Sequence, residues 1–238
     1  PDSWIIIRNT ILYNIVFIFL GTAFSVFIAI LLNECSRKWQ KRYQTLILIP
    51  HLLSYVVVSY IAYAFLGAEN GMINNQILRP LGLDPISFYT EDKYWPFILV
   101  FVNIWKTFGY SSIIYFASII GIDRTYYEAA EVDGASAWTQ IWSITLPLLK
   151  PVLITMLLLS VGRILYSDFG LFYQVPMDSG MLFNTTNTID TFVYRGLLQT
   201  NDLGRAAAAN FIQSVMGFFL VLGANLIVRK VEKEYALF

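Results

Sequence analysis

The sequence predicts an all-α membrane protein with about five transmembrane helices. Of its 238 residues, 57% are hydrophobic and only 13% are charged, which is about half the charged share usual in soluble domains. The charges are also unevenly placed, because five long apolar segments contain only Lys106 and Arg163 among them. A helix that spans a bilayer needs about 20 mainly apolar residues. These segments are apolar on every side, whereas the helices of a soluble protein would be amphipathic.

The composition also excludes several classes of protein. Sixteen Lys and Arg balance sixteen Asp and Glu, so a nucleic-acid binder with a net basic face is excluded. Cys35 is the only cysteine and His51 the only histidine, which excludes a disulfide framework and leaves no basis for a metal site. We interpret Cys35 as a reduced thiol without function and His51 as a hydrogen-bonded packing residue rather than a ligand.

The charges between the apolar segments predict the topology. The five expected spans are residues 10–32, 43–66, 95–119, 151–167 and 206–228. The fourth is short unless it continues to about Val175. The positive-inside rule places two stretches in the cytoplasm: Arg37, Lys38, Lys41 and Arg42 in one, and the tail 229–234 in the other. Segments 67–94 and 168–205 then lie outside and 120–150 inside. An outside N-terminus without a signal peptide leads us to expect a sixth, upstream span.

Short elements are expected in the two outer segments. Turn-forming Gly and Pro residues surround a short helical piece near 72–79, and residues 189–199 are expected to form an interfacial helix. The Asn184-Thr185-Thr186 sequon is interpreted as a coincidence. No repeat or linker divides the chain, so residues 1–238 are predicted to form a single transmembrane domain that includes the inner loop 121–150.

This inner loop differs from the others. Thr125 and Glu128 match a capping box, so we expect a short helix to start at Thr125 and to end at Gly134. Ser136 is expected to cap a second helix toward Leu146-Pro147. Trp138, Ile141 and Trp142 would share one face of that helix. Four acidic residues against two basic ones give the loop two net negative charges, against the local bias, which predicts a partner for it.

The spacing in this loop resembles a known motif. Glu128-Ala129-Ala130, three residues, Gly134, nine residues, Ile144, one residue and Leu146-Pro147 resembles the EAA motif of ABC importer permeases. The resemblance implies that the loop forms a coupling helix that fits a cleft of an ATP-hydrolysing subunit, with the glutamate paired to a basic residue there. The residues implied in this contact are Glu128, Ala129, Ala130, Asp133, Gly134, Ile144, Leu146 and Pro147.

The resemblance also implies a set of partners. A second homologous permease subunit would complete the pore, two ATP-binding subunits would bind the coupling loops, and an extracytoplasmic binding protein would deliver substrate. This chain has no phosphate-binding Gly-rich loop, so it is expected to be no enzyme and to hold no cofactor. ATP and Mg would belong to the partner ATPase. The expected location is the bacterial plasma membrane, with the C-terminus in the cytoplasm.

Other segments resemble one branch of these permeases. Leu31-Leu32-Asn33-Glu34, Pro50-His51, Gly121-Ile122-Asp123 and residues 189–195 are similar to the oligosaccharide or polysaccharide branch, and Arg8-Asn9-Thr10 looks like the start of the permease core. An oligosaccharide substrate is therefore implied, while the exact sugar and the identity of the second permease stay open. The likeness departs at the N-terminus, where the family normally carries one further span.

Polar side chains inside the spans are candidates for a substrate pathway, since ionisable groups in a bilayer are costly and usually face a cavity or a partner. Amide, hydroxyl and aromatic groups suit sugars. The alternative is that they hold helices together or reach the membrane surface. The candidates are Asn103, Lys106, Tyr110, Arg163, Tyr166, Asn210 and Gln213.

Two other classes of protein compete with this interpretation. An ion-coupled secondary transporter of a polar solute would use Lys106 or Arg163 to neutralise an ion or an anionic substrate. An intramembrane enzyme, such as a lipid-linked transferase, is disfavoured because no paired carboxylates or His/Ser constellation lies in the spans.

Overall fold

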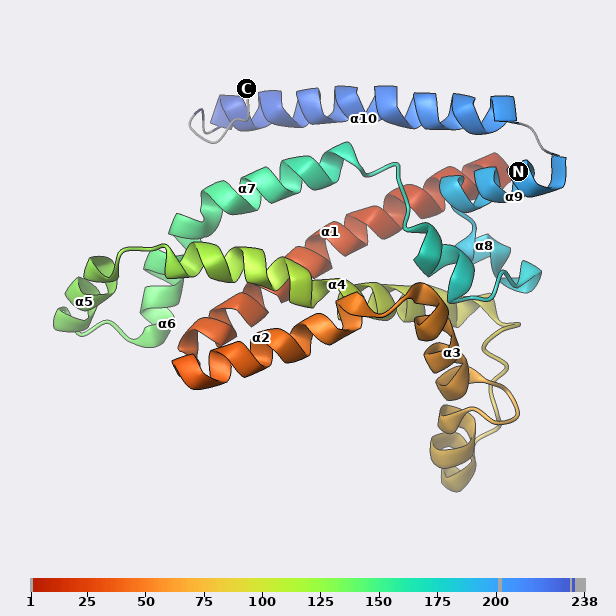
Figure 1. Ribbon diagram of the computed structural model, residues 1–238, viewed down its shortest axis with the longest axis horizontal. Helices are drawn as coiled ribbons and strands as arrows, with labels where there is room; N and C mark the ends of the chain where they lie inside the picture. Colours follow the sequence, from red (N-terminus) through yellow and green to blue (C-terminus); the bar gives the residue numbers. More distant parts are fainter. Residues whose placement is uncertain (1, 201–202, 232, 234–238) are drawn as a thin grey trace. The chain divides into compact units, whose positions relative to one another are not determined.

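The computed structural model describes residues 2–200, 203–231 and 233, and over these residues the chain is helical without any β-strand. The long helices are labelled in Figure 1. The α-helices are α1 (Asp2–Glu34), α2 (Arg37–Leu52), α3 (Tyr55–Leu66), α4 (Trp95–Ile120), α5 (Arg124–Val132), α6 (Ala137–Gln140), α7 (Leu146–Gly162), α8 (Phe183–Thr186), α9 (Ile189–Thr200) and α10 (Leu203–Val231). The π and 3-10 segments are η1 (Ile73–Leu78), η2 (Arg79–Leu81), η3 (Asp92–Tyr94), η4 (Ile141–Thr145), η5 (Gly170–Gln174) and η6 (Gly180–Leu182).

Most of the predicted spans are present. Among the described residues, four helical stretches are long and apolar enough to cross a membrane. They are Ser3–Glu34, Asp92–Ile120, Ala137–Gly162 and Ala206–Lys230. The predicted first, third and fifth spans are therefore confirmed as helices. The Arg8-Asn9-Thr10 segment lies within α1 rather than before it.

The second span is not the continuous helix predicted over 43–66. The segment divides into α2 and α3, a sharply bent pair. Two local features explain the break. Pro50 lies in the last turn of α2, where it lacks the amide that would continue the hydrogen-bond ladder. Ser54 then starts α3 as its N-cap, its side chain accepting a hydrogen bond from the Val57 amide at 3.3 Å.

The fourth span was also misplaced by the sequence prediction. Residues 137–162 form one helical stretch, so the expected second helix of the inner loop runs directly into the span. The helix ends at Gly162, not near 167 or Val175. Pro147 has no amide, and its ring would clash with the carbonyl four residues earlier. The wider π turn of η4, just before α7, accommodates it.

The predicted short outer elements are present as helical segments. η1 covers residues 73–78, within the piece expected near 72–79. α9 begins at Ile189 as predicted and extends to Thr200. Its position relative to a membrane surface stays a prediction.

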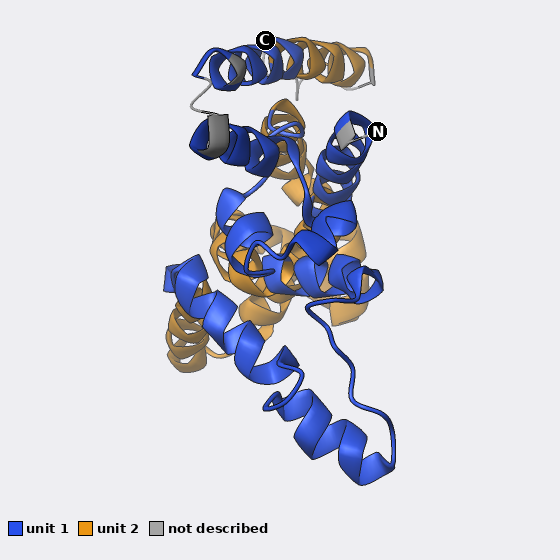
Figure 2. Cartoon of the chain, turned by 90° about the vertical axis from the view of Figure 1, so that its right-hand side faces the viewer, with its two compact units in different colours: residues 1–17, 52–103, 163–217 blue, residues 18–51, 104–162, 218–238 orange. Residues whose placement is uncertain are grey.

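The chain divides into two compact units, which are coloured separately in Figure 2. Unit 1 comprises residues 1–17, 52–103 and 163–217, and unit 2 comprises residues 18–51, 104–162 and 218–238. The helices α1, α4 and α10 contribute residues to both units.

The core of unit 2 joins three helices. It consists of Val26, Ala29 and Leu32 of α1, Tyr115, Phe116 and Ile119 of α4, and Leu149 of α7. Helix α2 lies against α4 at Gly109, where an added Cβ would collide with the Ile47 carbonyl oxygen. Small residues allow such close helix contacts within membranes, so the sequence needs glycine at this position.

Unit 1 has its own buried centre. Trp95 and Leu99 of α4, Leu171 and Phe172 of η5, and Leu182 are almost fully buried. The Trp95 indole donates a hydrogen bond to the Phe88 carbonyl at 2.7 Å, so its one polar atom is satisfied as burial of tryptophan requires.

Candidate functional site

The inner loop begins with α5, whose start differs from the predicted capping box. Asp123, two residues before Thr125, is the N-cap, and its carboxylate accepts a hydrogen bond from the Thr125 amide at 3.0 Å. Bonds from the Thr125 backbone and side chain hold the pKa of the Asp123 carboxyl below its ordinary value. A charged cap outcompetes the threonine because it also interacts favourably with the positive end of the helix.

The end of α5 matches the prediction at Gly134. The Gly134 amide bonds to the Glu131 carbonyl at 3.0 Å, and the Ala135 amide bonds to the Ala130 carbonyl at 2.8 Å. Gly134 has a φ of 78°, in the left-handed region that residues with a Cβ avoid. This pair of bonds is the Schellman motif that terminates many helices, and it turns the chain toward α6.

The second half of the loop starts at Ser136, as predicted. Its Oγ accepts a hydrogen bond from the Thr139 amide at 3.2 Å. Trp138 and Trp142 then lie one turn apart, with ring centroids at 5.8 Å in an edge-on arrangement. Trp138 is 68% exposed and Trp142 58%. Two large apolar rings held against each other on the surface favour a protein partner.

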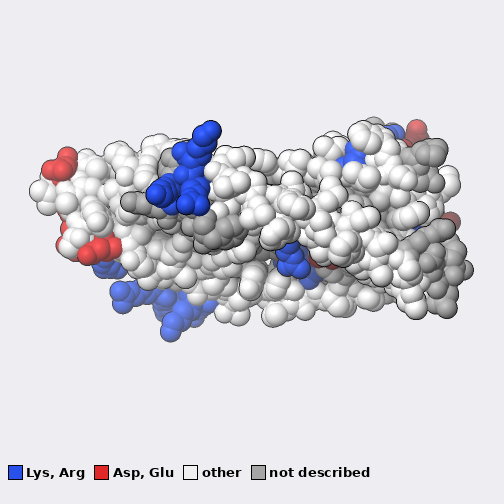
Figure 3. Space-filling view, turned by 90° about the horizontal axis from the view of Figure 1, so that it is seen from above, with Lys and Arg blue, Asp and Glu red and all other residues white. Residues whose placement is uncertain are grey.

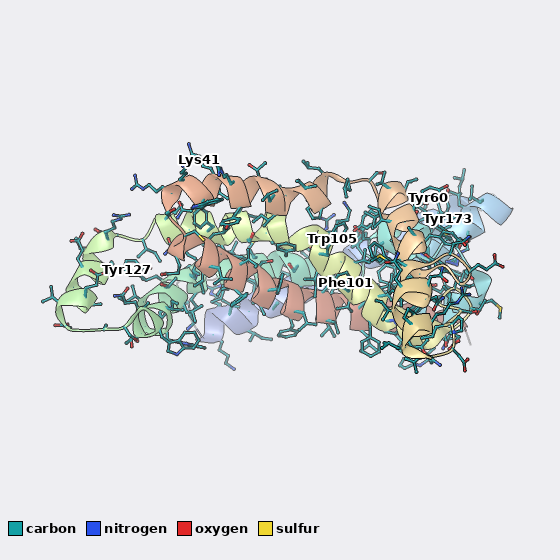
Figure 4. The ribbon with its side chains drawn as sticks, turned by 90° about the horizontal axis from the view of Figure 1, so that it is seen from below. Lys41, Tyr60, Phe101, Trp105, Tyr127 and Tyr173 are labelled. Atoms are coloured by element: carbon teal, nitrogen blue, oxygen red, sulfur yellow. The ribbon has the colours of Figure 1, made fainter. Side chains whose placement is uncertain are left out.

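A hydrogen bond between two side chains connects the two halves of the loop. The Tyr127 hydroxyl and the Thr145 Oγ1 lie 2.9 Å apart, and Thr145 is buried at the base of α7. Figure 4 labels Tyr127 on α5. Because η4 continues into α7, this hydrogen bond connects α5 to a membrane-capable helix.

The residues implied by the EAA resemblance all lie on this part of unit 2. Glu128, Ala129, Asp133, Gly134 and Pro147 are exposed, while Ala130, Ile144 and Leu146 are half-buried. Figure 3 shows acidic side chains gathered over α5. The loop is thus an acidic surface with a pair of exposed indoles.

The side-chain ammonium group of Lys106, a pathway candidate in unit 2, is hydrogen-bonded to backbone carbonyl oxygens. Its side chain is buried, and Nζ donates to the carbonyls of His51 at 3.0 Å and Pro50 at 3.4 Å. These carbonyls belong to the last turn of α2, where backbone oxygens lack helical partners and the helix dipole favours a cation. The contact connects α4 to the end of α2.

His51 differs from the hydrogen-bonded packing residue expected from the sequence. Its ring stacks on Tyr110 of α4, with centroids 4.8 Å apart and planes 13° apart. His51 is exposed, and Tyr110 is 54% exposed. Together with Lys106, one turn earlier on α4, the pair forms a polar site at the end of α2.

The candidates in unit 1 fall into two sets. Arg163 follows the last residue of α7 and is exposed, so its expected place inside the fourth span is wrong. Candidates from the fourth and fifth predicted spans contact each other's segments. Tyr166 Oη lies 2.7 Å from Ser214 Oγ, and Gln213 Nε2 donates a hydrogen bond to the Leu165 carbonyl at 2.7 Å. Asn103 is buried, and Asn210 is exposed.

Sequence reasoning missed two amides that organise unit 1. Asn14 Nδ2 donates to the Ile164 and Tyr166 carbonyls at 3.0 and 2.9 Å. Asn9 Nδ2 donates to the carbonyls of Asn184 and Asn187 at 3.1 and 3.0 Å. Asn14 interrupts an apolar stretch of α1, which was the available signal, whereas Asn9 lies in the polar segment Arg8-Asn9-Thr10.

A carboxylate was missed as well. Asp190 Oδ2 accepts hydrogen bonds from the Ser167 amide at 2.6 Å and from Ser167 Oγ at 2.8 Å. Gln213 Nε2 lies 3.5 Å from the other carboxylate oxygen. The bonds of Asn9, Asn14, Gln213 and Asp190 connect residues 164–190 to α1 and α10; we call this set the outer network.

Membrane-capable helices and an exposed acidic loop continuous with one of them define a class: the membrane-spanning subunit of a multi-protein transport system. Residues 6–233 match the family described as binding-protein-dependent transport system inner membrane component, and the chain belongs to this family. It is therefore an inner-membrane permease component of an ABC importer and no enzyme. ATP hydrolysis in this family is carried out by a separate subunit.

Similar proteins support this placement. The chain is 31% identical to the protein LplB of Bacillus subtilis over 98% of its length and 73% of the relative. It is also 31% identical to the polygalacturonan/rhamnogalacturonan transport system permease protein YteP of the same organism, over 98% and 72%. A chain of a bacterial ABC transporter that imports the acidic polysaccharide alginate has the same fold, with a TM-score of 0.90, 32% identity, and coverage of 98% and 80%.

Proposed function

We propose that this chain carries an oligosaccharide across the bacterial plasma membrane. The observation that carries the proposal is the braced inner loop, which presents an acidic, indole-bearing surface and continues into α7. Permeases for sugar polymers among its relatives, and the alginate importer that shares its fold, support the substrate class.

The proposed mechanism follows from the loop. Two partner ATPases bind ATP and Mg and close on each other, which moves the surface formed by Glu128, Ala129, Ala130, Asp133 and Gly134. Ile144, Leu146 and Pro147 lie where the loop meets α7 and pass this movement to the span. An extracytoplasmic binding protein supplies the sugar, and a second permease subunit, homologous or identical, completes the pore.

The proposed orientation places residues 34–42 and the C-terminus in the cytoplasm. Cys35 precedes α2 and is half-buried, so it is a natural probe. Cysteine labelling of intact cells should reach Cys35 only after the membrane is permeabilised. Neutralising the basic residues of α2 should disturb insertion of the first two spans. Labelling from outside would overturn the topology and with it the coupling role of the loop.

The pathway candidates stay proposals in this function. A neutral sugar held by many polar contacts gains about 0.5–1.5 kcal/mol from each. Asn103→Ala, Tyr110→Ala, Tyr166→Phe, Asn210→Ala or Gln213→Ala should then each weaken uptake by about tenfold or less. Lys106→Ala and Arg163→Ala should do more only for an acidic sugar, because a cation paired with a carboxylate contributes a larger free energy.

The decisive experiment is purification of the complex, identification of its subunits, and uptake by proteoliposomes. Matched neutral and acidic oligosaccharides are offered with and without ATP and with the ion gradient collapsed. ATP-dependent uptake that survives loss of the gradient supports the proposal. Uptake that needs the gradient and not ATP would instead indicate an ion-coupled transporter. A complex that carries no sugar of the panel would contradict the substrate class while leaving the permease role intact.

A further inference from the structure

The first two turns of α2 form a basic surface with no assigned role beyond orientation. Arg37, Lys38, Lys41 and Arg42 are all exposed, and the sequence of α2 from Arg37 to Leu52 contains no Asp or Glu. Their spacing of i, i+1, i+4 and i+5 places all four on one side of the helix. Four cations on one side, without an acidic residue on the same helix, give this side a positive potential.

Two aromatic rings stand beside these cations. Trp39 and Tyr43 stack with centroids 5.8 Å apart, and the Arg42 guanidinium lies 4.9 Å from the centre of the Trp39 ring. Trp39 is 47% exposed and Tyr43 42%. Tryptophan and tyrosine in this setting favour the boundary between lipid headgroups and acyl chains. The cation–π contact favours a position of the Arg42 guanidinium over the Trp39 ring.

The surface contains an open hollow of about 510 Å³, lined by Lys41, Arg42, Thr45 and Leu46. Two cations and a hydroxyl form its polar side and a leucine its apolar side. Figure 4 shows Lys41 projecting away from α2. The positive charge of the two basic side chains can bind a phosphate group, and the neighbouring apolar wall suits hydrocarbon.

The apolar side continues along the helix. Arg42, Leu46 and Ile49 are spaced i, i+4 and i+7, so they form one stripe, and Leu46 and Ile49 are 57% and 48% exposed. The stripe changes from cationic to apolar in the direction of the membrane interior. An amphiphile with an anionic head and a hydrocarbon tail is complementary to it along its length.

We propose that this surface is a binding site for an anionic phospholipid. The headgroup phosphate occupies the hollow against Lys41 and Arg42, while an acyl chain lies along Leu46 and Ile49. We call it the α2 lipid site. A protein partner is the weaker match, because the basic face passes along the same helix into the exposed apolar stripe of Leu46 and Ile49. The proposal is independent of the transported solute.

The test measures contact between Trp39 and lipid in the assembled transporter. The complex is placed in nanodiscs of phosphatidylcholine with increasing phosphatidylglycerol, whose acyl chains are brominated and quench tryptophan. A Trp39→Phe version of the complex is subtracted to isolate the emission of Trp39. We expect saturable quenching that is half complete at a few mole per cent of phosphatidylglycerol, and no such saturation with brominated phosphatidylcholine.

The variant Lys41→Gln/Arg42→Gln should shift half-saturation upward roughly tenfold or more, because each basic residue contributes to attraction by an anionic headgroup. The charge-preserving Lys41→Arg/Arg42→Lys should stay within about threefold of the unmodified protein. The matched control Arg229→Gln/Lys230→Gln removes two exposed cations near the end of α10 and should change nothing. Labelling of Cys35 confirms that each variant is inserted in the same orientation.

Three outcomes would overturn the α2 lipid site. One is equal quenching in Lys41→Gln/Arg42→Gln and the unmodified complex. Another is displacement of the lipid by millimolar inorganic phosphate at constant ionic strength, which would assign the hollow to a free anion. The third is loss of ATPase co-purification in the variant without a change in quenching, which would assign the surface to a protein contact.

Discussion

The inner loop and the outer network solve different structural problems with different kinds of contact. In the loop, the stabilising hydrogen bonds are local. The Asp123 carboxylate accepts from the Thr125 amide, Ser136 Oγ accepts from the Thr139 amide, and the Ala135 amide donates to the Ala130 carbonyl. In the outer network the bonds join distant residues, such as Asn14 to Tyr166 and Gln213 to Leu165, across 152 and 48 positions of the chain.

The difference follows from what each region must do. The docking role proposed for the loop requires a free surface. Glu128 and the two indoles are exposed accordingly, and the loop is held by the side-chain caps of Asp123 and Ser136, the backbone bonds at Gly134 and the Tyr127–Thr145 bond. The outer network instead satisfies the carbonyls of an irregular segment next to apolar helices. Carbonyls outside regular helices have no intrahelical partner, and a buried one left without a hydrogen bond is costly.

The largest effect is expected where the loop meets its proposed partner. Glu128→Lys reverses an exposed charge on α5, so ATP-driven uptake should fall to background while insertion is unchanged. Uptake by proteoliposomes and co-purification of the ATPase are the measurements. The control is Glu131→Lys, an equal reversal on the same helix outside the EAA pattern, which should retain most activity. Normal uptake in Glu128→Lys would remove the coupling role.

A substitution in the outer network should act on stability instead. Asn14→Ala removes the donor to the Ile164 and Tyr166 carbonyls, and the loss should cost about 1–3 kcal/mol. The thermal midpoint of the purified complex, measured with the unmodified protein as reference, should fall accordingly. Asn210→Ala removes an exposed amide from α10 and serves as control, with a small change in the midpoint. An unchanged midpoint in Asn14→Ala would show that water satisfies these carbonyls.

A third change tests whether the loop is coupled to α7 through the contact between Tyr127 and Thr145. Tyr127→Phe removes the hydroxyl that lies 2.9 Å from Thr145 Oγ1, a bond worth about 0.5–1.5 kcal/mol. We expect ATPase activity to persist while the number of sugars imported per ATP falls by a few-fold. Tyr126→Phe, on the exposed side of α5, should leave this ratio unchanged. An equal ratio in both variants would locate the coupling in the backbone alone.

The same contrast explains how much the sequence alone could predict. The end of α5 at Gly134 and the start of α6 at Ser136 were predictable, because each helix terminus depends on residues within one turn of it. The break between α2 and α3 was missed because an apolar stretch containing Pro50 is equally compatible with a kinked continuous span. The early end of α7 at Gly162 was missed for a related reason, since the following residues are apolar enough to continue a helix.

Functional residues follow the same division. The EAA spacing is local, so the sequence indicated a set of candidate coupling residues, and the structure places these candidates together on one loop. The environment of Lys106 could not be predicted, because its carbonyl partners at Pro50 and His51 lie 56 and 55 residues away. Likewise, nothing near Asp190 in the sequence indicates that it receives two bonds from Ser167.

The smallest effect is expected at the cap of α5, and it depends on pH. The hydrogen bonds from Thr125 hold the pKa of Asp123 below its ordinary value. The stabilisation of α5 is therefore complete above the ordinary pKa of about 3.9 and is lost as the pH falls through the lower folded-state value. Hydrogen exchange of the α5 amides in the purified complex, corrected for intrinsic rates, should thus show constant protection from pH 7 down to about 5 and a decline at more acidic pH.

Asp123→Asn keeps a capping oxygen but cannot titrate, so its α5 protection should be slightly lower at neutral pH, and the acid-dependent decline should be absent. The Ser136 cap of α6 provides an internal reference, because it carries no charge. If the acid-dependent decline persisted in Asp123→Asn, a different carboxylate of the loop, such as Glu128 or Glu131, would control the start of α5.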